Sequence, residues 1–162
     1  MQKFIFVVRH AKSSWANDEK DINRPLNDRG LEDAPKMAKL FSSLIKDDLK
    51  IISSPANRAL TTANFFRDAC NLKEEIEINE DLYFGSEEDY LIAAQNTDNK
   101  FNAVAIFGHN PKIEYFCSKV KNSYNENIPT CAILKFSCKV SNWKEVEWNS
   151  LHLDEYFFPK EI

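Results

Sequence analysis

The sequence of 162 residues predicts an α/β fold, a three-layer sandwich around a mainly parallel central sheet. Continuous apolar runs recur along the chain, and such runs are typical of strands that are covered on both faces. Three of these runs are followed along the chain by segments whose apolar residues recur at helical spacing. Strands and helices that alternate in this way indicate helices packed on both faces of a parallel sheet.

The first strand is predicted over residues 4–8, which are all apolar and deliver Arg9 and His10 at the strand's end. A polar stretch follows and precedes a helix, whose apolar residues recur three or four positions apart. These residues are Leu31, Ala34, Ala38, Phe41 and Ile45. Because Pro35 lacks a backbone N–H, this helix is expected either to kink there or to begin nearer Asp33.

The second strand is predicted over 49–52, and the serines and proline of 53–55 are expected to open the next helix. A serine would cap that helix, and Pro55 would be its first helical residue. Its predicted buried face consists of Ala59, Thr62, Ala63 and Phe66. A third strand is predicted over 76–78, and the capping box over 86–89 predicts the start of a further helix.

The C-terminal half begins with a buried strand over 103–107, which ends close to His109 and leads into another predicted helix. The apolar residues of that helix are Ile113, Phe116, Cys117 and Val120. Beyond it, residues 132–136 and 144–148 are expected to form a pair of strands.

The composition excludes several classes of protein. The chain has 21 Lys plus Arg against 25 Asp plus Glu, a formal net charge of −4, so no general affinity for nucleic acid or an anionic membrane is expected. No apolar run is long enough for a signal peptide or a membrane span, which predicts a cytoplasmic protein. The four cysteines include no Cys-x-x-Cys pair and are expected to be reduced and packed. No linker or repeat is visible, so residues 1–162 are expected to form one domain, whose oligomeric state the sequence leaves open.

Side chains that could perform chemistry follow three of the predicted strands: Arg9 with His10, Arg58, and His109. In open α/β sheets, ligands bind at the carboxyl ends of the strands, so these side chains are expected to share one site. Each of them alone would more often be structural, and their recurrence at three strand ends is what favours a site.

The residue types at this site suit phosphoryl chemistry. A phosphoryl group carries about two negative charges near neutral pH, and the planar guanidinium groups of Arg9 and Arg58 could clamp its oxygens. His10 could attack phosphorus if its attacking nitrogen is unprotonated and its other nitrogen is hydrogen-bonded. His109 could act in its protonated form and stabilise charge on the transferring oxygens. These residues predict a phosphatase in which His10 is transiently phosphorylated.

Four segments resemble the histidine phosphatase superfamily in residues, order and spacing. They are Arg9-His10-Ala11-Lys12-Ser13, the segment from Arg24 to Gly30, Ser53-Ser54-Pro55 with Arg58, and Gly108-His109-Asn110-Pro111. Ala11 stands where the superfamily usually has glycine, and this favours the SixA-type phosphohistidine phosphatases. The resemblance implies a phosphoglycerate mutase-like fold, with His10 as the nucleophile and Arg9, Arg58 and His109 on the phosphoryl group. It also implies that no metal and no organic cofactor is needed.

Three further side chains are candidates for the site. Glu80 lies in a segment similar to the loop of related phosphatases in which a general acid occurs. Alternatively, Glu80 belongs to a solvated acidic loop without a catalytic role. Ser13 could bind a phosphate oxygen or satisfy the backbone of its own turn. Arg24 could reach a phosphate or a neighbouring carboxylate of the substrate, although an exposed arginine commonly has no such role.

The favoured function is hydrolysis of protein phosphohistidine, because imidazole leaves more readily than an alkoxide and needs less help from an acid. The alternative is a phosphatase of a small phosphorylated metabolite, which would gain from an acid and a closing segment. A mutase is disfavoured because no long insertion could enclose its intermediate. A binding module that only recognises phosphate is disfavoured because the set of His10, Arg9, Arg58 and His109 is complete.

Overall fold

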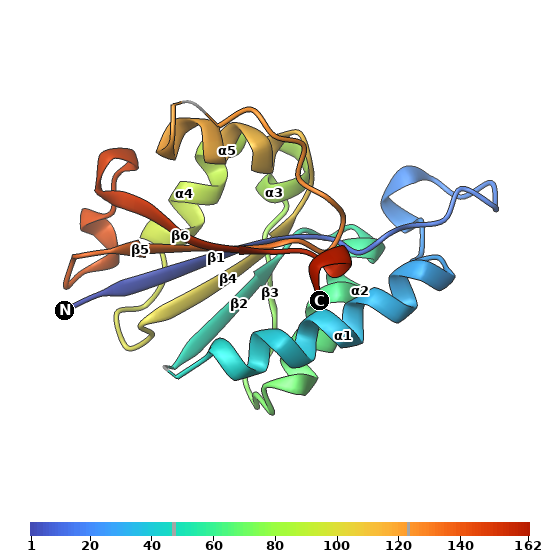
Figure 1. Cartoon of the computed structure of the whole chain (residues 1–162), viewed down its shortest axis with the longest axis horizontal. Coiled ribbons are helices and arrows are strands. Elements are labelled where there is room, and N and C mark those ends of the chain that lie inside the picture. Colours follow the sequence, from blue (N-terminus) through green and yellow to red (C-terminus); the bar gives the residue numbers. More distant parts are fainter. Residues whose placement is uncertain (47, 123) are drawn as a thin grey trace.

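The computed structural model describes residues 1–46, 48–122 and 124–162, and within them six strands form one sheet in the order β3-β2-β4-β1-β5-β6 (Figure 1). The parallel strands are β1 (Lys3–Arg9), β2 (Leu49–Ser53), β3 (Glu77–Ile78) and β4 (Ala103–Gly108). The antiparallel strands are β5 (Ile133–Cys138), which pairs with β1, and β6 (Leu151–Phe157) at the edge. The predicted α/β class and the mainly parallel sheet are confirmed.

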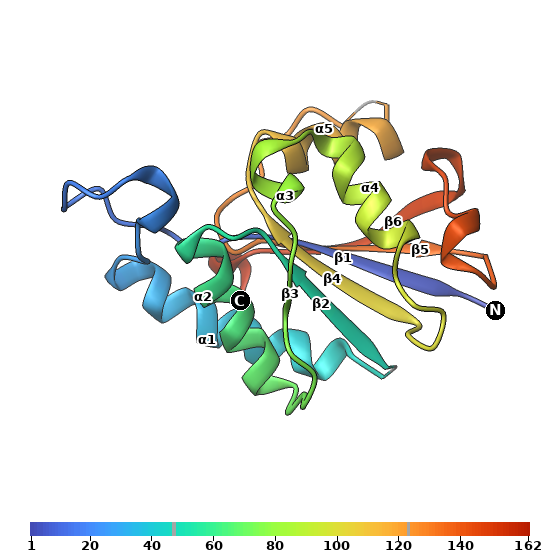
Figure 2. The same cartoon turned by 180° about the vertical axis from the view of Figure 1, so that it is seen from behind.

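Helices cover both faces of this sheet (Figures 1 and 2). On one face lie α1 (Asp28–Leu44) and α2 (Asn57–Ala69), and on the other lie α3 (Asp81–Phe84), α4 (Glu87–Gln95) and α5 (Lys112–Val120). Successive side chains of a strand point to opposite faces, so Ile5 and Val7 belong to one core while Phe6 and Val8 belong to the other. Two apolar cores explain why the run in β1 is continuous rather than alternating.

Helix α1 begins at Asp28 and therefore not at the alternative start nearer Asp33. The side chain of Asn27 accepts a hydrogen bond from the backbone N–H of Gly30 at 2.9 Å, which caps the helix before Asp28 and leaves Pro35 inside it. Pro35 lies on the exposed side, where water can reach the Leu31 carbonyl that its missing N–H leaves free. Leu31 is 48% exposed, so the prediction that it belongs to the apolar face of this helix was wrong.

Helix α2 also begins differently from the prediction. Pro55 is not the first helical residue, because the helix starts at Asn57 with Ala56 as its N-cap residue. The Ser54 hydroxyl instead accepts a hydrogen bond from the Ala56 N–H at 3.2 Å, before the helix begins. Arg58 nevertheless lies in the first turn, as expected, and the predicted buried face of the helix is confirmed.

The second strand of the C-terminal pair was predicted wrongly. Residues 144–148 are not a strand: they run from the short 3₁₀ helix Trp143–Glu145 to the start of a second one, Trp148–Ser150, and the strand β6 comes after both. The indole N–H of the fully buried Trp143 donates to the Phe101 carbonyl at 2.9 Å, and this contact holds the chain in a turn. Burial of one large aromatic therefore overrides the strand-like pattern.

The sheet brings three strand ends together. Strand β4 lies between β1 and β2, and the register pairs Arg9 with Gly108 and Ser53 with Phe107. Beyond the ends, the His10 N–H donates to the Gly108 carbonyl at 3.1 Å, and the Ser54 N–H donates to the Phe107 carbonyl at 3.0 Å. The residues that follow β1, β2 and β4 thus start from one line across the sheet.

None of the helices in the described residues has both the length and the apolar composition that a membrane span requires.

Candidate active site

A hollow of about 290 Å³ lies at these three strand ends. Its lining residues are Arg9, His10, Lys12, Ser13, Trp15, Arg24, Arg58, His109, Asn110 and Thr130. All the predicted site residues except Glu80 are among them. Among the residues that the structure describes, four guanidinium or ammonium groups and no carboxylate line this hollow, so its walls suit an anion.

His10 is held with one ring nitrogen engaged. Its Nδ1 lies 2.7 Å from the backbone carbonyl of Ala11, and because a carbonyl only accepts, Nδ1 carries the proton and Nε2 has a free lone pair. Burial above all, with the nearby positive charges of Arg58 and Arg9, lowers the pKa of His10 to about 3. The imidazole is therefore neutral at physiological pH, as a nucleophilic histidine needs to be.

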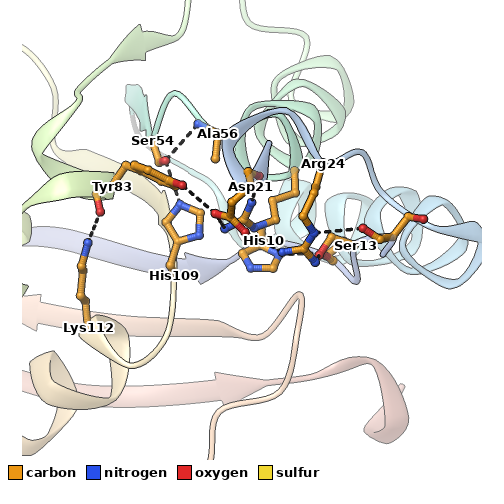
Figure 3. A network of polar contacts seen from close by, with 12 residues as sticks. His10, Ser13, Asp21, Arg24, Ser54, Ala56, Tyr83, His109 and Lys112 are labelled. Carbon is orange, nitrogen blue, oxygen red and sulfur yellow. Dashed lines mark hydrogen bonds and ion pairs between the residues drawn. The ribbon is translucent and has the colours of Figure 1, made fainter. Parts of the chain in front are cut away.

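His109 faces His10, with 5.2 Å between the ring centroids (Figure 3). Its Nε2 lies 2.8 Å from the hydroxyl oxygen of Ser54, and its backbone N–H donates to the buried hydroxyl of Tyr90 at 3.0 Å. Burial, followed by nearby cationic groups, lowers the pKa of His109 to about 2. The surroundings that the chain itself provides thus favour a neutral His109 rather than the predicted protonated form.

Arg9 has hydrogen-bonding capacity to spare. Its Nη1 donates to the Ile128 carbonyl at 2.7 Å, whereas its Nε is buried without a hydrogen-bond partner among the described residues. The Nδ1 of His109 is buried and unpartnered in the same way. Buried polar atoms are rarely left unpaired in proteins, so these two atoms indicate a ligand that offers them hydrogen-bond partners.

Arg24 is buried rather than exposed, with only 6% of its surface accessible. It donates to the Ser14 carbonyl at 3.0 Å and to the hydroxyl of Ser13, and its guanidinium carbon lies 3.2 Å from the ring centroid of Trp15. Ser13 therefore orients Arg24 in this structure, while Trp15 forms a stacked and mostly exposed wall at the mouth of the hollow.

Asp21 is the residue of the site that sequence reasoning missed. Its carboxylate accepts hydrogen bonds from Arg24 at 2.9 Å, from Arg58 at 3.0 Å and from the Tyr83 hydroxyl at 2.6 Å. Arg58 also donates to the backbone carbonyl of Asp21 at 2.7 Å, so both of its terminal nitrogens are held. The bond from Tyr83 first, and then those from the two arginines, hold the pKa of Asp21 well below its usual range. The one signal in the sequence was an acidic residue three positions before Arg24.

The comparisons with known proteins agree with this geometry. The sequence model of the histidine phosphatase superfamily (branch 1) matches residues 5–83, which include His10, Arg24 and Arg58. A solved structure assigned as the phosphohistidine phosphatase SixA from Agrobacterium tumefaciens is 26% identical, with a TM-score of 0.76 over 97% of this chain and 98% of that one. The chain is therefore similar in sequence and in fold to the histidine phosphatase superfamily. This similarity supports a phosphatase activity.

Other solved structures share the fold at lower identity. The protein histidine phosphatase SixA in complex with tungstate has a TM-score of 0.81 at 21% identity over 99% of both chains. A mycobacterial glucosyl-3-phosphoglycerate phosphatase has a TM-score of 0.69 at 12% identity over 95% of this chain and 98% of that one. These similarities confirm the phosphoglycerate mutase-like fold. No curated protein matches the sequence.

The segment that contains Glu80, which resembles the acid loop of this superfamily, contributes the ring of Tyr83 to the site and not a carboxyl group. Glu80 is exposed, precedes α3 and is absent from the lining of the hollow. From the same segment, the Tyr83 ring packs edge-on against His109, with centroids 5.5 Å apart. The Lys112 ammonium donates to the Tyr83 carbonyl, so both ends of this tyrosine are held (Figure 3).

No group of three or more His, Cys, Asp or Glu side chains that could hold a metal occurs among residues 1–46, 48–122 and 124–162. Metal independence nevertheless stays a prediction. The four cysteines are free thiols in this structure, and Cys117, Cys131 and Cys138 are buried, as expected, whereas Cys70 is partly exposed.

Proposed function

We propose that this chain is a phosphohistidine phosphatase whose His10 forms a covalent phosphoryl intermediate. The observation that carries the proposal is the fixed tautomer of His10. Its Nδ1 donates to the Ala11 carbonyl, so the lone pair on Nε2 is available inside a hollow walled by cations. The low pKa of the ring keeps this lone pair free at the pH of a cell.

In the first step, His10 Nε2 attacks phosphorus and the bond from phosphorus to the substrate's ring nitrogen breaks. The substrate ring, protonated at its other nitrogen, departs as neutral imidazole. In the second step, water attacks phosphorus and the electron pair of the P–N bond returns to Nε2. One proton of the water stays on the released phosphate, and the other passes to solvent. The mechanism requires no metal and no organic cofactor.

The remaining residues of the hollow stabilise the transferring group. Arg9 has an unpartnered Nε, and Arg58 is held in one orientation by Asp21, so both guanidinium groups would meet the phosphoryl oxygens with little reorganisation. A dianionic phosphoryl group beside His109 would raise the pKa of its ring and favour protonation, against the effect of burial. His109 would then donate from Nδ1 to an equatorial oxygen.

The absence of a carboxyl group from the lining supports phosphohistidine over a phosphoester as the substrate. An alkoxide needs a proton as it leaves, whereas an imidazole leaves without one. Asp21, at the rim, is held ionised and so cannot donate a proton. A phosphatase of a small phosphoester would require Glu80 or Asp81 to move into the hollow.

The test compares hydrolysis of a phosphohistidine-bearing carrier protein with that of phosphoserine and other phosphometabolites. We expect the wild type to hydrolyse the phosphohistidine protein faster, with a radiolabelled phosphoryl group trapped on the enzyme during turnover. His10→Ala should lose both turnover and label, while Glu80→Gln should keep hydrolysis of phosphohistidine. Addition of EDTA should leave the wild-type rate unchanged.

His152→Ala is the matched control, because His152 is an exposed histidine on β6. Full activity of His10→Ala would refute the mechanism. Loss of phosphohistidine hydrolysis in Glu80→Gln would refute the argument from the leaving group. A faster reaction with a phosphometabolite would favour the alternative substrate class, and binding without turnover would favour a recognition module.

A further inference from the structure

A second hollow, also of about 290 Å³, adjoins the phosphoryl site and shares Lys12 and Thr130 with it. Its other lining residues are Arg29, Asp33, Pro129, Phe158, Pro159 and Lys160. They come from α1, from the segment before β5 and from the C-terminal turn after β6. The two hollows therefore meet at Lys12 and Thr130, and the second hollow lies next to the place where a phosphorus atom would bind at His10.

Lys12 is fixed at the boundary between the two hollows. Its backbone carbonyl accepts a hydrogen bond from the Asn27 N–H at 3.0 Å. The start of α1 lies so close that a Cβ at Gly30 would be 2.1 Å from this carbonyl oxygen. The backbone of Lys12 is thus clamped, while its side chain is exposed and forms no ion pair within the described residues.

The second hollow has positive charge that its own residues do not balance. Arg29 is paired with the buried carboxylate of Asp33 at 3.1 Å, so these two charges offset each other. Lys160 forms no ion pair in the part of the chain that the structure describes. The turn that carries it is held in place because the Lys36 ammonium donates to the Pro159 carbonyl at 3.2 Å. Two ammonium groups, those of Lys12 and Lys160, are therefore free to bind an anion.

We propose that this hollow is a substrate subsite for a carboxylate close to the phosphohistidine on the target protein. The two free ammonium groups would bind the carboxylate, and the apolar walls of Phe158 and Pro129 would cover its methylene groups. The inference rests on the proposed function, because it places the phosphorus of a phosphohistidine protein at His10. According to this inference, the second hollow takes no part in the chemical step but makes the enzyme prefer substrates with acidic residues next to the phosphohistidine.

The experiment uses two phosphohistidine peptides that differ only in flanking residues, Glu and Asp in one and Gln and Asn in the other. We expect the wild type to show a KM about two- to fivefold lower for the acidic peptide, the range that partly exposed ion pairs support. This preference should fall toward one in Lys160→Gln, and also in the wild type at high ionic strength. Lys139→Gln is the control, since Lys139 is exposed and follows β5 at the opposite end of the sheet.

Turnover of both peptides by the wild type with equal KM would overturn the subsite and leave the proposed function intact. An acidic preference that Lys160→Gln retains in full, or that Lys139→Gln loses equally, would also overturn it. Failure of the wild type to hydrolyse either peptide, when the phosphorylated peptides are intact, would refute the proposed function itself.

Discussion

At the residue scale, the arginines of the site depend on a carboxylate that takes no part in the proposed reaction. Asp21 binds Arg24 and Arg58 through its side chain and also holds Arg58 through its backbone carbonyl. Each guanidinium would otherwise lose rotamer freedom when phosphate binds, at a cost of up to about 2 kcal/mol. Asp21 is therefore a positioning residue, and the hydroxyl of Tyr83 supports it by donating a hydrogen bond to its carboxylate.

We predict that Asp21→Asn lowers kcat/KM for the phosphohistidine substrate by about 10- to 100-fold, because misplaced arginines stabilise the transition state poorly. Tyr83→Phe removes a single hydrogen bond and should cost about fivefold. Steady-state kinetics and thermal melting of both variants check this. Asp18→Asn, an exposed change in the same segment, is the control. Equal rates for Asp21→Asn and the wild type would show that the arginines keep their orientation without the carboxylate.

At the element scale, the site depends on how closely α1 approaches the chain that follows β1. Gly30 lies in the first turn of α1 with Lys12, two residues after His10, directly against it. Only a residue without Cβ permits this approach, because the neighbouring atom is a backbone oxygen that cannot swing away. The glycine therefore has a packing reason inside a helix, where glycine is otherwise unfavourable.

The substitution Gly30→Ala tests this contact, because the close approach and an ordinary helix predict changes of opposite sign in the free energy of unfolding. In an ordinary helix the change stabilises by about 1 kcal/mol, whereas here we expect a loss of about 1–3 kcal/mol from the clash with Lys12. Urea unfolding measures the difference, with Lys39→Ala on the exposed face of α1 as the control. A stabilised Gly30→Ala variant would contradict the close approach.

At the scale of the whole molecule, the sheet order converts three remote segments into one site. Strand β4 separates β1 from β2, so His109 lies between the residues that the other two strand ends deliver. Bringing these groups together has a cost, because two histidines become buried among cations. The pKa of His10 falls to about 3 and that of His109 to about 2.

This burial makes the folded state sensitive to acid. In the unfolded chain both histidines regain an ordinary pKa of about 6.5, so below that pH the unfolded state binds more protons than the folded state. The free energy of unfolding should therefore fall as pH is lowered from 6.5 to 4.5, by up to about 1.4 kcal/mol per pH unit for each histidine. Asp21 does not enter this window, because a carboxylate with a lowered pKa loses its stabilising effect only below about pH 4.

Urea unfolding at several pH values measures the slope, and the double variant His10→Gln, His109→Gln should flatten it. His152→Gln serves as the control for loss of an exposed histidine. An unchanged slope in the double variant would show that other groups cause the acid sensitivity.

The sequence alone determined the strands that carry the site residues at their ends. A continuous apolar run such as residues 4–8 is stable as a strand only where both of its faces are covered. The sequence also determined which chemistry Arg9, His10, Arg58 and His109 could perform, since that follows from residue type. The starts of α1 and α2 and the position of β6 were less certain or wrong, because caps and one buried tryptophan decide them.

Only the tertiary structure decided how the site is charged and held. Asp21 meets Arg58 across 37 positions of sequence and Tyr83 across 62, contacts that no local pattern encodes. The neutral state of His109 likewise follows from burial among cations from other elements. Residue type sets what a side chain can do, whereas its protonation and orientation depend on neighbours that the fold brings to it.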